Sequence, residues 1–279
     1  MTDSTTHTPF EANPWQAIYL CTLDNMRQVW PHDWPGLPVV VQACIHRLWP
    51  NSPPEAEHTS GQLLAAATAM AHRIETLALA APYEPFYHNR LHTADALTAV
   101  CLLIQSLQQQ HYTLDDDWVA SLLLAVTSHD VRHPGGANGF LQEFEQQSVQ
   151  ELQQVLADFS LEKHWPNRVS EMILRTDPTL VASNHDKVKN TAFVMNMDWA
   201  CVLINEADIL ASATAHCGPD LGRALSQEWA LKNHPLHHVV GTPSGRLHFL
   251  SSLRFSTPAS EAFQIAPSVQ HQIHALQKM

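Results

Sequence analysis

The sequence predicts an all-α protein, and three observations support this prediction. Ala, Leu and Gln, which favour helices, are abundant; glycine is sparse, with 9 residues; and no segment alternates convincingly between apolar and polar residues. Of the 279 residues, 45% are hydrophobic, so the chain can bury a sizeable core. We therefore expect a compact, multi-helix domain.

The N-terminal quarter contains two clear breaks. Residues 1–14 are polar and are predicted to form a flexible tail, which leaves 15–279 as a single helical domain. Within it, the prolines of WPHDWPGLP and of PNSPPEAEHTS set off residues 15–60 as a possible N-terminal helical subdomain. Ser60 is the expected N-cap of the next helix, over 61–79.

The rest of the chain shows helical periodicity interrupted by short loops. After the break APYEPF, apolar residues at 91, 94, 97, 98, 101 and 104 recur at helical spacing. Another helix starts at Asp115 and ends before VRHPGGANG, because the sequence HPGG cannot continue a helix. Further helices are expected over 141–158, 165–177, 187–215, 220–233 and 259–277.

Charge and cysteine usage narrow the function classes. The net charge of −12 argues against a basic groove for a nucleic-acid polymer. Five scattered cysteines without a CxxC motif indicate reduced thiols in a cytoplasmic protein. No signal-peptide pattern is seen at the N-terminus, and no apolar run approaches membrane-spanning length, so we expect no membrane association. The oligomeric state stays open.

His88 and His92 are the first candidates for chemistry. Their spacing of four residues places them on one face of a helix, as suits two ligands of one metal or one ligand beside a catalytic group. Asp95, three residues further on, could face them as well. The alternative is coincidence, because the chain contains 19 histidines.

Asp130 and Asp208 are aspartates in apolar surroundings, so each is expected to need a cation or a hydrogen-bond donor as a partner. His129 and Asp130 lie at the end of the apolar helix SLLLAV, and Asp208 lies inside the apolar stretch VLINEADILASA. A buried carboxylate is costly unless it is paired or binds a metal. The alternatives are a polar pair facing water for His129 and Asp130, and a buried salt bridge for Asp208.

Taken together, these residues predict a metal site. Imidazole and carboxylate ligands suit zinc, manganese, iron or magnesium. A bridging aspartate could hold two metals ~3.5–4 Å apart, the arrangement used for in-line displacement at phosphorus. Metal ions would also let an acidic protein bind an anionic substrate.

The order of these motifs resembles the HD superfamily of metal-dependent phosphohydrolases. More specifically, YHNRLH at 87–92 resembles the YHNxxH signature of class I 3',5'-cyclic nucleotide phosphodiesterases, and residues 129–141 resemble their HDVDHPGxxNxFL segment without a gap. SVQE at 148–151, ILRTD at 173–177 and ADI at 207–209 resemble later motifs of that family, in the same order. The resemblance covers about residues 80 to 255.

The resemblance implies a role for each matching residue. A first metal, zinc or iron, would be held by His92, His129, Asp130 and Asp208. A second, magnesium or manganese, would share Asp130, and its water ligands would be held by His133, Glu151 and Thr176. A hydroxide bridging the two metals would attack phosphorus, and His88, oriented by Glu228, would protonate the leaving ribose oxygen as general acid.

The substrate pocket departs from the family pattern. Arg132 replaces the second Asp of HDVDH, Ala211 stands where the family has a base-reading Asn, and the family's QGD motif after the orienting Glu is missing. The resemblance implies Tyr87, Arg246 and Phe249 as substrate-binding residues, with Arg246 in place of the purine-binding glutamine. Because arginine offers only donors, we expect a weak preference or none for cAMP. The alternatives are a further phosphate or a surface charge for Arg246, and core packing for Phe249.

The expected function is hydrolysis of a small-molecule phosphoester, foremost of a 3',5'-cyclic nucleotide to the 5'-monophosphate. Three alternatives stay open: hydrolysis of another phosphodiester or phosphomonoester, oxidation of a substrate by two irons on an HD fold, and a degenerate binding protein. The YHN that precedes His92 and the HPG that follows His129 and Asp130 favour hydrolysis, because a general acid is useful there. Metal analysis separates the oxygenase from the hydrolases.

Overall fold

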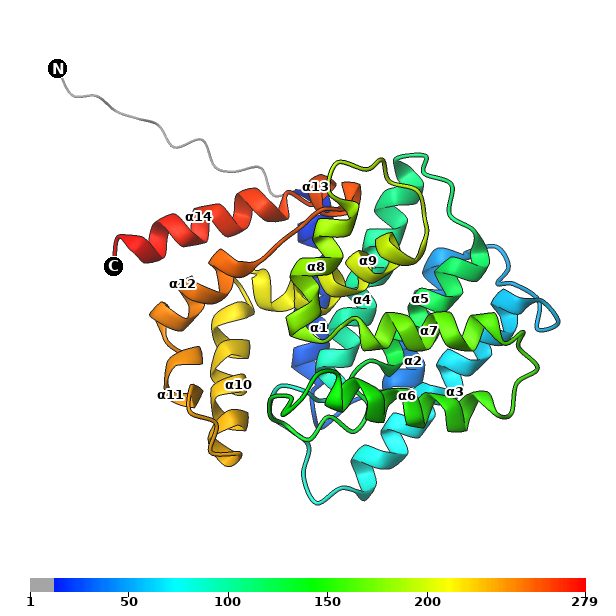
Figure 1. Cartoon of the computed structure of the whole chain (residues 1–279), viewed down its shortest axis with the longest axis horizontal. Coiled ribbons are helices and arrows are strands. Elements are labelled where there is room, and N and C mark those ends of the chain that lie inside the picture. The colour runs from blue at the N-terminus through cyan, green and yellow to red at the C-terminus, as the bar shows by residue number, and fades with distance from the viewer. Residues whose placement is uncertain (1–12) are drawn as a thin grey trace.

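The computed structural model describes residues 13–279, and this part of the chain contains helices and no strand (Figure 1). The all-α prediction is confirmed. The helices are α1 (Pro14–Val29), α2 (Leu37–Leu48), α3 (Thr59–Ala80), α4 (Arg90–Gln109), α5 (Asp116–Ser128), α6 (Glu143–Leu156), α7 (His164–Leu174), α8 (Pro178–Val188), α9 (Met197–Ala213), α10 (Gly218–Leu231), α11 (His237–Val240), α12 (Pro243–Ser252), α13 (Pro258–Ala262) and α14 (Ile265–Gln277). Of the tail predicted over 1–14, residues 1–12 lie outside the described part.

Three buried helices form the centre of the fold. Almost every side chain of α4 between His92 and Leu107 is buried, as is every side chain of α5 between Val119 and Ser128. Helix α9 packs on both, and α3 packs along α5. Because other helices pack around these three, few of their side chains are exposed.

The outer helices lie in two groups on either side of this centre. Helices α10 to α12 and α14 lie on one side, and α3, α6 and α7 lie on the other, with α4 and α9 between them (Figure 1). Helix α1 packs on α4, and α2 packs on α3 and α4, so their apolar side chains join the same core. The proposed division at residue 60 stays a prediction.

Two predicted helices are interrupted. The helix expected over 187–215 is wrong, because α8 ends at Val188 and α9 begins only at Met197. Asn190 adopts a left-handed conformation and Asn196 caps α9, so both asparagines stop and restart the helix. The helix expected over 259–277 is split at Gln264, which also has a positive φ of 54°. Helices α11 and α12 were not expected at all.

One helix of the described residues, α3, is long and apolar enough to cross a membrane by length and composition. No membrane-spanning segment was expected from the sequence, because it contains no uninterrupted apolar run of that length. In this fold α3 packs against α2 and α5 and buries nine of its residues, so its composition also suits a core helix. The expectation of no membrane association stays a prediction.

Candidate active site

The four predicted metal ligands come from the three central helices. His92 lies in the first turn of α4, His129 and Asp130 directly follow α5, and Asp208 lies in α9. Helices α4 and α5 pack side by side, so the start of one meets the end of the other. The Asn89 side chain fixes the start of α4, because its Oδ1 accepts a hydrogen bond from the His92 backbone N–H.

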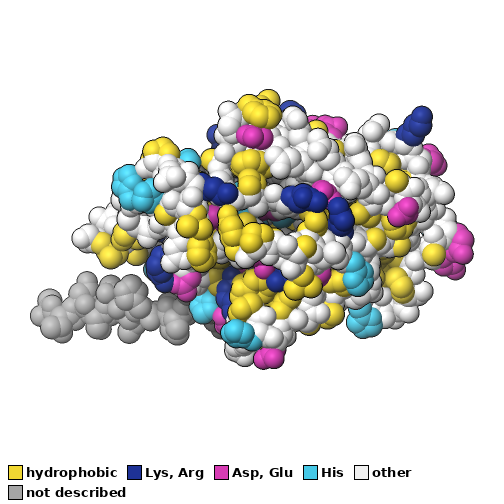
Figure 2. Space-filling view, turned by 90° about the horizontal axis from the view of Figure 1, so that it is seen from below, with side chains coloured by type: hydrophobic (Ala, Val, Ile, Leu, Met, Phe, Trp, Pro, Cys, Tyr) yellow, Lys and Arg dark blue, Asp and Glu magenta, His cyan; other side chains and the backbone are white. Residues whose placement is uncertain are grey.

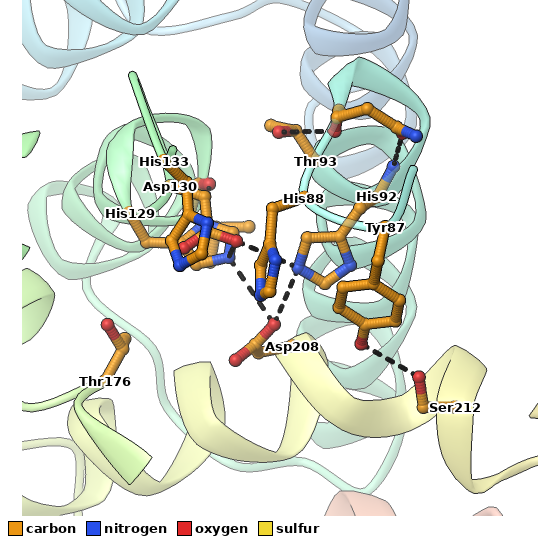
Figure 3. Close-up of polar contacts among 12 residues, drawn as sticks. Tyr87, His88, His92, Thr93, His129, Asp130, His133, Thr176, Asp208 and Ser212 are labelled. Carbon is orange, nitrogen blue, oxygen red and sulfur yellow. Dashed lines mark hydrogen bonds and ion pairs between the residues drawn. The ribbon is translucent and has the colours of Figure 1, made fainter. Parts of the chain in front are cut away.

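These four side chains meet at one point (Figure 3). The Nε2 atom of His92 lies 3.2 Å from Oδ2 of Asp130 and 3.0 Å from Oδ1 of Asp208. The corresponding distances from Nε2 of His129 are 3.3 and 3.4 Å. Ligand atoms about 2.0–2.1 Å from a common ion are separated by roughly 2.8–3.4 Å, the lower end at octahedral and the upper end at tetrahedral angles. The spacing therefore matches a shared ion.

The two histidines present their unpaired nitrogens to this point. Nε2 of His92 and Nε2 of His129 are fully buried and have no well-directed hydrogen bond, despite the nearby carboxylates. The other nitrogen of His129, Nδ1, lies 2.7 Å from the carbonyl oxygen of Val126, to which it donates in the neutral ring. That contact directs the lone pair of Nε2 into the cluster, as in metal-bound histidines. The donor set therefore fits a divalent metal.

The electrostatics of the cluster support the same conclusion. Burial disfavours a charge on His92, but Asp130 and Asp208 outweigh it and raise the pKa of His92 to about 9. Burial likewise opposes ionisation of Asp208, yet His129 and His92 hold its pKa well below the usual range. Despite burial, His129 and His92 hold the pKa of Asp130 low as well, so both carboxylates stay ionised at the cluster, where a cation would stabilise them.

Asp95 does not join this cluster. Its carboxylate accepts two hydrogen bonds from the Arg27 guanidinium of α1, at 3.0 and 2.6 Å. The sequence allowed Asp95 to face His92, and this possibility is wrong, because the buried carboxylate is already neutralised by arginine. Asp208, by contrast, belongs to the cluster. The alternative that it forms a buried salt bridge with Lys or Arg is not seen among the described residues, because its charged neighbours are His92 and His129.

His88 lies beside the cluster and contacts Glu228 of α10. Nδ1 of His88 is 2.5 Å from Oε1 of Glu228. Oε2 of the same carboxylate accepts hydrogen bonds from the backbone N–H groups of Tyr87 and His88, at 2.8 and 3.0 Å. Burial raises the pKa of Glu228, but the contact with His88 outweighs this and leaves the pKa below its usual value. An ionised Glu228 therefore orients the His88 ring.

The glycine of the HPGG loop permits this contact. Gly135 has a φ of +77°, and a Cβ atom there would lie 2.9 Å from Cγ of Glu228. Its N–H donates to Nδ1 of His133 at 3.2 Å, which leaves the hydrogen of the neutral ring on Nε2. Burial, and then His88, lower the pKa of His133 to about 3. His133 is therefore a neutral donor stacked on His88, with ring centroids 3.6 Å apart.

The other residues expected near a second metal are engaged elsewhere. Oε2 of Glu151 lies 3.0 Å from the Arg73 guanidinium, and Oε1 lies 2.5 Å from Nε of Arg132. The Thr176 hydroxyl donates to the carbonyl of Ile173 at 2.7 Å. Arg73 was missed from the sequence, because no local pattern links it to a residue 78 positions away. The roles expected for Glu151 and Thr176 stay predictions.

Arg246 of α12 is largely occupied by the protein itself. It donates to the carbonyl oxygens of Ser212 and Thr214 and to the side chain of Gln272, at 2.5, 2.8 and 2.6 Å. Phe249 lies beneath the guanidinium, 5.9 Å away. The Arg246 guanidinium is therefore not a free charge on the surface, and these hydrogen bonds already use N–H groups that could otherwise bind a base. A role of Arg246 in reading a base stays a prediction without geometric support.

Tyr87 lies between these two regions. Its hydroxyl shares a hydrogen bond of 2.9 Å with the Ser212 hydroxyl, and its ring lies 4.8 Å from that of His92 (Figure 3). Ser212 was not singled out from the sequence, because its only signal is its position four residues after Asp208. Tyr87 thus fixes the His92 ring, and its predicted contact with substrate stays a prediction.

Comparison with known proteins agrees with this geometry. Residues 87–175 match the family model described as 3'5'-cyclic nucleotide phosphodiesterase. A relative named 3',5'-cyclic-nucleotide phosphodiesterase 2, from Saccharomyces cerevisiae, is 30% identical over 144 residues, which are 44% of this chain and 26% of the relative. The match therefore spans about a quarter of that relative.

A solved structure extends the agreement to the fold. The phosphodiesterase domain of the RhoPDE fusion protein from the choanoflagellate Salpingoeca rosetta superposes with a TM-score of 0.62 at 14% identity, over 86% of this chain and 88% of that one. The sequence match contains His88, His92, His129 and Asp130, whereas Asp208 lies outside it. Residues 87–175 are therefore similar to the 3'5'-cyclic nucleotide phosphodiesterase family, and the chain shares the fold of a phosphodiesterase domain.

Proposed function

We propose that this protein hydrolyses a 3',5'-cyclic nucleotide to the 5'-monophosphate with the aid of bound divalent metals. The observation that carries the proposal is the convergence of His92, His129, Asp130 and Asp208, with two unpartnered imidazole nitrogens aimed at one point. Zinc or iron suits this mixed nitrogen and oxygen donor set.

A second ion would share Asp130. Both histidines contact Oδ2 of Asp130, which leaves Oδ1 for magnesium or manganese and its waters. Glu151 is already paired with two arginines, so its hold on those waters would be weaker than the family pattern implies. When bound, divalent metals polarise the phosphate and lower the pKa of water.

The protein's own groups would complete the reaction at the leaving oxygen. His88 would donate the proton on Nε2 to the ribose oxygen as its bond to phosphorus breaks. Glu228 would hold the ring at Nδ1 and stabilise its protonated form before transfer. The neutral His133, stacked on His88, would keep the ring from turning and could donate its own Nε2 hydrogen to a phosphate oxygen.

A screen of cyclic nucleotides and other phosphoesters with zinc, magnesium and manganese would test the proposal. We expect metal-dependent release of 5'-monophosphate from at least one cyclic nucleotide. Turnover of only a linear phosphodiester or a monoester would favour the second hydrolase reading. Two bound irons together with oxygen consumption would instead favour the HD-fold oxygenase.

A further inference from the structure

A cavity of about 560 Å³ lies between α1, α2 and α4, which supply nearly all of its lining. None of the residues of the metal-ligand cluster lines it. Three of its lining residues carry sulfur, namely Met26, Cys44 and Cys101, and we therefore call it the sulfur pocket. Its volume falls within the range of about 300–1,000 Å³ that small-molecule sites occupy.

The two cysteines of the sulfur pocket come from different helices and lie close together. Cys44 belongs to α2 and Cys101 to α4, and these helices pack against each other. The Cys44 thiol lies 3.6 Å from the carbonyl oxygen of Leu97, one turn before Cys101, and the Cys101 thiol lies 3.8 Å from the carbonyl oxygen of Cys44. A contact with the Cys101 thiol, and then burial, raise the pKa of Cys44 well above its usual value. Without a metal, the Cys44 thiol therefore keeps its proton.

The donor atoms of the sulfur pocket suit a soft cation. The Met26 thioether of α1 lines the pocket together with the two thiols, and ligands of this kind select Cu(I). Zinc prefers a closed tetrahedral set of nitrogen and sulfur ligands. In the part of the chain that the structure describes, no histidine or carboxylate lies close enough to both thiols to build such a set. Monovalent copper accepts fewer ligands than zinc, so the sulfurs present are sufficient.

Arg47 supplies a positive charge to the same pocket. It lines the pocket from α2, and it lowers the pKa of Cys44 against the larger effects of Cys101 and burial. Its Nε donates to Oε1 of Gln105 at 2.9 Å, and no carboxylate of the described residues pairs with it. Two thiolates around a monovalent cation carry one net negative charge, which costs much less to bury beside an unpaired guanidinium.

We propose that the sulfur pocket binds Cu(I) between the thiolates of Cys44 and Cys101, with the Met26 thioether beside the ion. On binding, two S–H bonds break, two Cu–S bonds form and both protons pass to solvent, so no electron is transferred. Val40 and Leu102 contribute apolar wall, which disfavours a hydrated ion such as magnesium. The site is independent of the proposed hydrolysis.

The first test measures copper affinity. The reduced full chain is titrated anaerobically with Cu(I) in competition with bicinchoninate, whose copper complex is coloured. We expect the wild type to withdraw a single equivalent from the chelator, and Cys44→Ser and Cys101→Ser to lose this binding. Cys201→Ser is the matched control and should bind as wild type. Cys201 is also buried and lies 3.7 Å from the Met197 sulfur, but it does not line the pocket.

A second variant leaves the core intact. Arg47 is exposed, so Arg47→Gln removes the charge without changing buried packing. We expect Cu(I) binding to weaken roughly 10- to 100-fold, as for other side chains that support a metal site without coordinating the ion. Arg223→Gln replaces an exposed arginine of α10 away from the pocket and should leave the affinity unchanged. Wild-type affinity in Arg47→Gln would overturn the proposed site, even if a serine variant failed to fold.

Copper could also bind to surface histidines, which Figure 2 shows at several places on one face of the molecule. X-ray absorption at the copper edge separates the two cases. We expect only sulfur neighbours around the bound ion. Nitrogen or oxygen neighbours, retained binding in folded Cys44→Ser and Cys101→Ser, or no binding by the wild type would overturn the inference. None of these measurements uses turnover, so their failure would leave the proposed function untouched.

Discussion

Replacing Glu228 by glutamine is the sharpest probe of the acid assigned to this site. The substitution keeps an acceptor for the backbone N–H groups of Tyr87 and His88, but it removes the charge that faces the His88 ring at 2.5 Å. A hydrogen bond to a charged group contributes about 1.5–3 kcal/mol. If that energy stabilises the protonated ring, Glu228→Gln should lower kcat roughly 10- to 150-fold.

The leaving group provides the assay for this prediction. A ribose oxygen needs a proton as it departs, whereas p-nitrophenolate does not. We therefore expect Glu228→Gln to slow hydrolysis of a cyclic nucleotide far more than hydrolysis of a p-nitrophenyl phosphodiester, with metal content unchanged. Equal losses with both substrates would refute the reasoning, because they would indicate that Glu228 supports the site as a whole and not the acid.

Three further substitutions have distinct expected outcomes. His88→Ala should retain the metals and lose turnover chiefly with poor leaving groups; wild-type rates on such substrates would rule out His88 as the acid. Asp208→Ala removes the ligand that contacts both histidines, so metal content measured by mass spectrometry and turnover should fall together; retained metal would show that the site is misplaced. Burial, and then Arg254, lower the pKa of His185 to about 4. The unfolded chain then binds more protons than the folded one as pH falls from about 6.5 to about 4, which costs about 3 kcal/mol of stability over that window. In urea unfolding, His185→Gln should lose less stability than wild type from about pH 7 to about pH 5; an identical pH profile would contradict this.

The residues of the candidate metal site were predictable because their signals are local. His88 and His92 are four residues apart on one helix, and His129 and Asp130 are adjacent at the end of an apolar helix. The convergence of these segments with Asp208 follows from burying apolar helices together. The order of motifs in the family supplied which segments meet.

The contacts that depend on distant partners could not be predicted. Asp95 pairs with Arg27, and Glu151 pairs with Arg73, although nothing near either residue marks its partner. The acceptors of Arg246 lie in α9 and α14, up to 34 residues away. These arginines already bind carboxylates and carbonyl groups that would otherwise be free to bind a metal or a substrate. The sequence therefore predicted which residues meet in the cluster better than it predicted the surroundings of Arg246.

The predicted helix boundaries were wrong where asparagine or proline residues end one helix and begin the next. Asp177 followed by Pro178 is a strong start signal for a helix, and α8 begins there. Asn196 similarly accepts a hydrogen bond from the N–H of Trp199 and restarts the chain as α9. The apolar residues at helical spacing around residues 189–196 indicated one continuous helix, so this break was not predicted.

Hydrolysis of a cyclic nucleotide in 18O-labelled water tests the central claim most directly. The site around His92, His129, Asp130 and Asp208 predicts a 5'-monophosphate that carries one solvent oxygen on phosphorus, formed only when a divalent metal is supplied. A 3'-monophosphate, an unlabelled product, or turnover that persists in Asp208→Ala without metal would contradict the account.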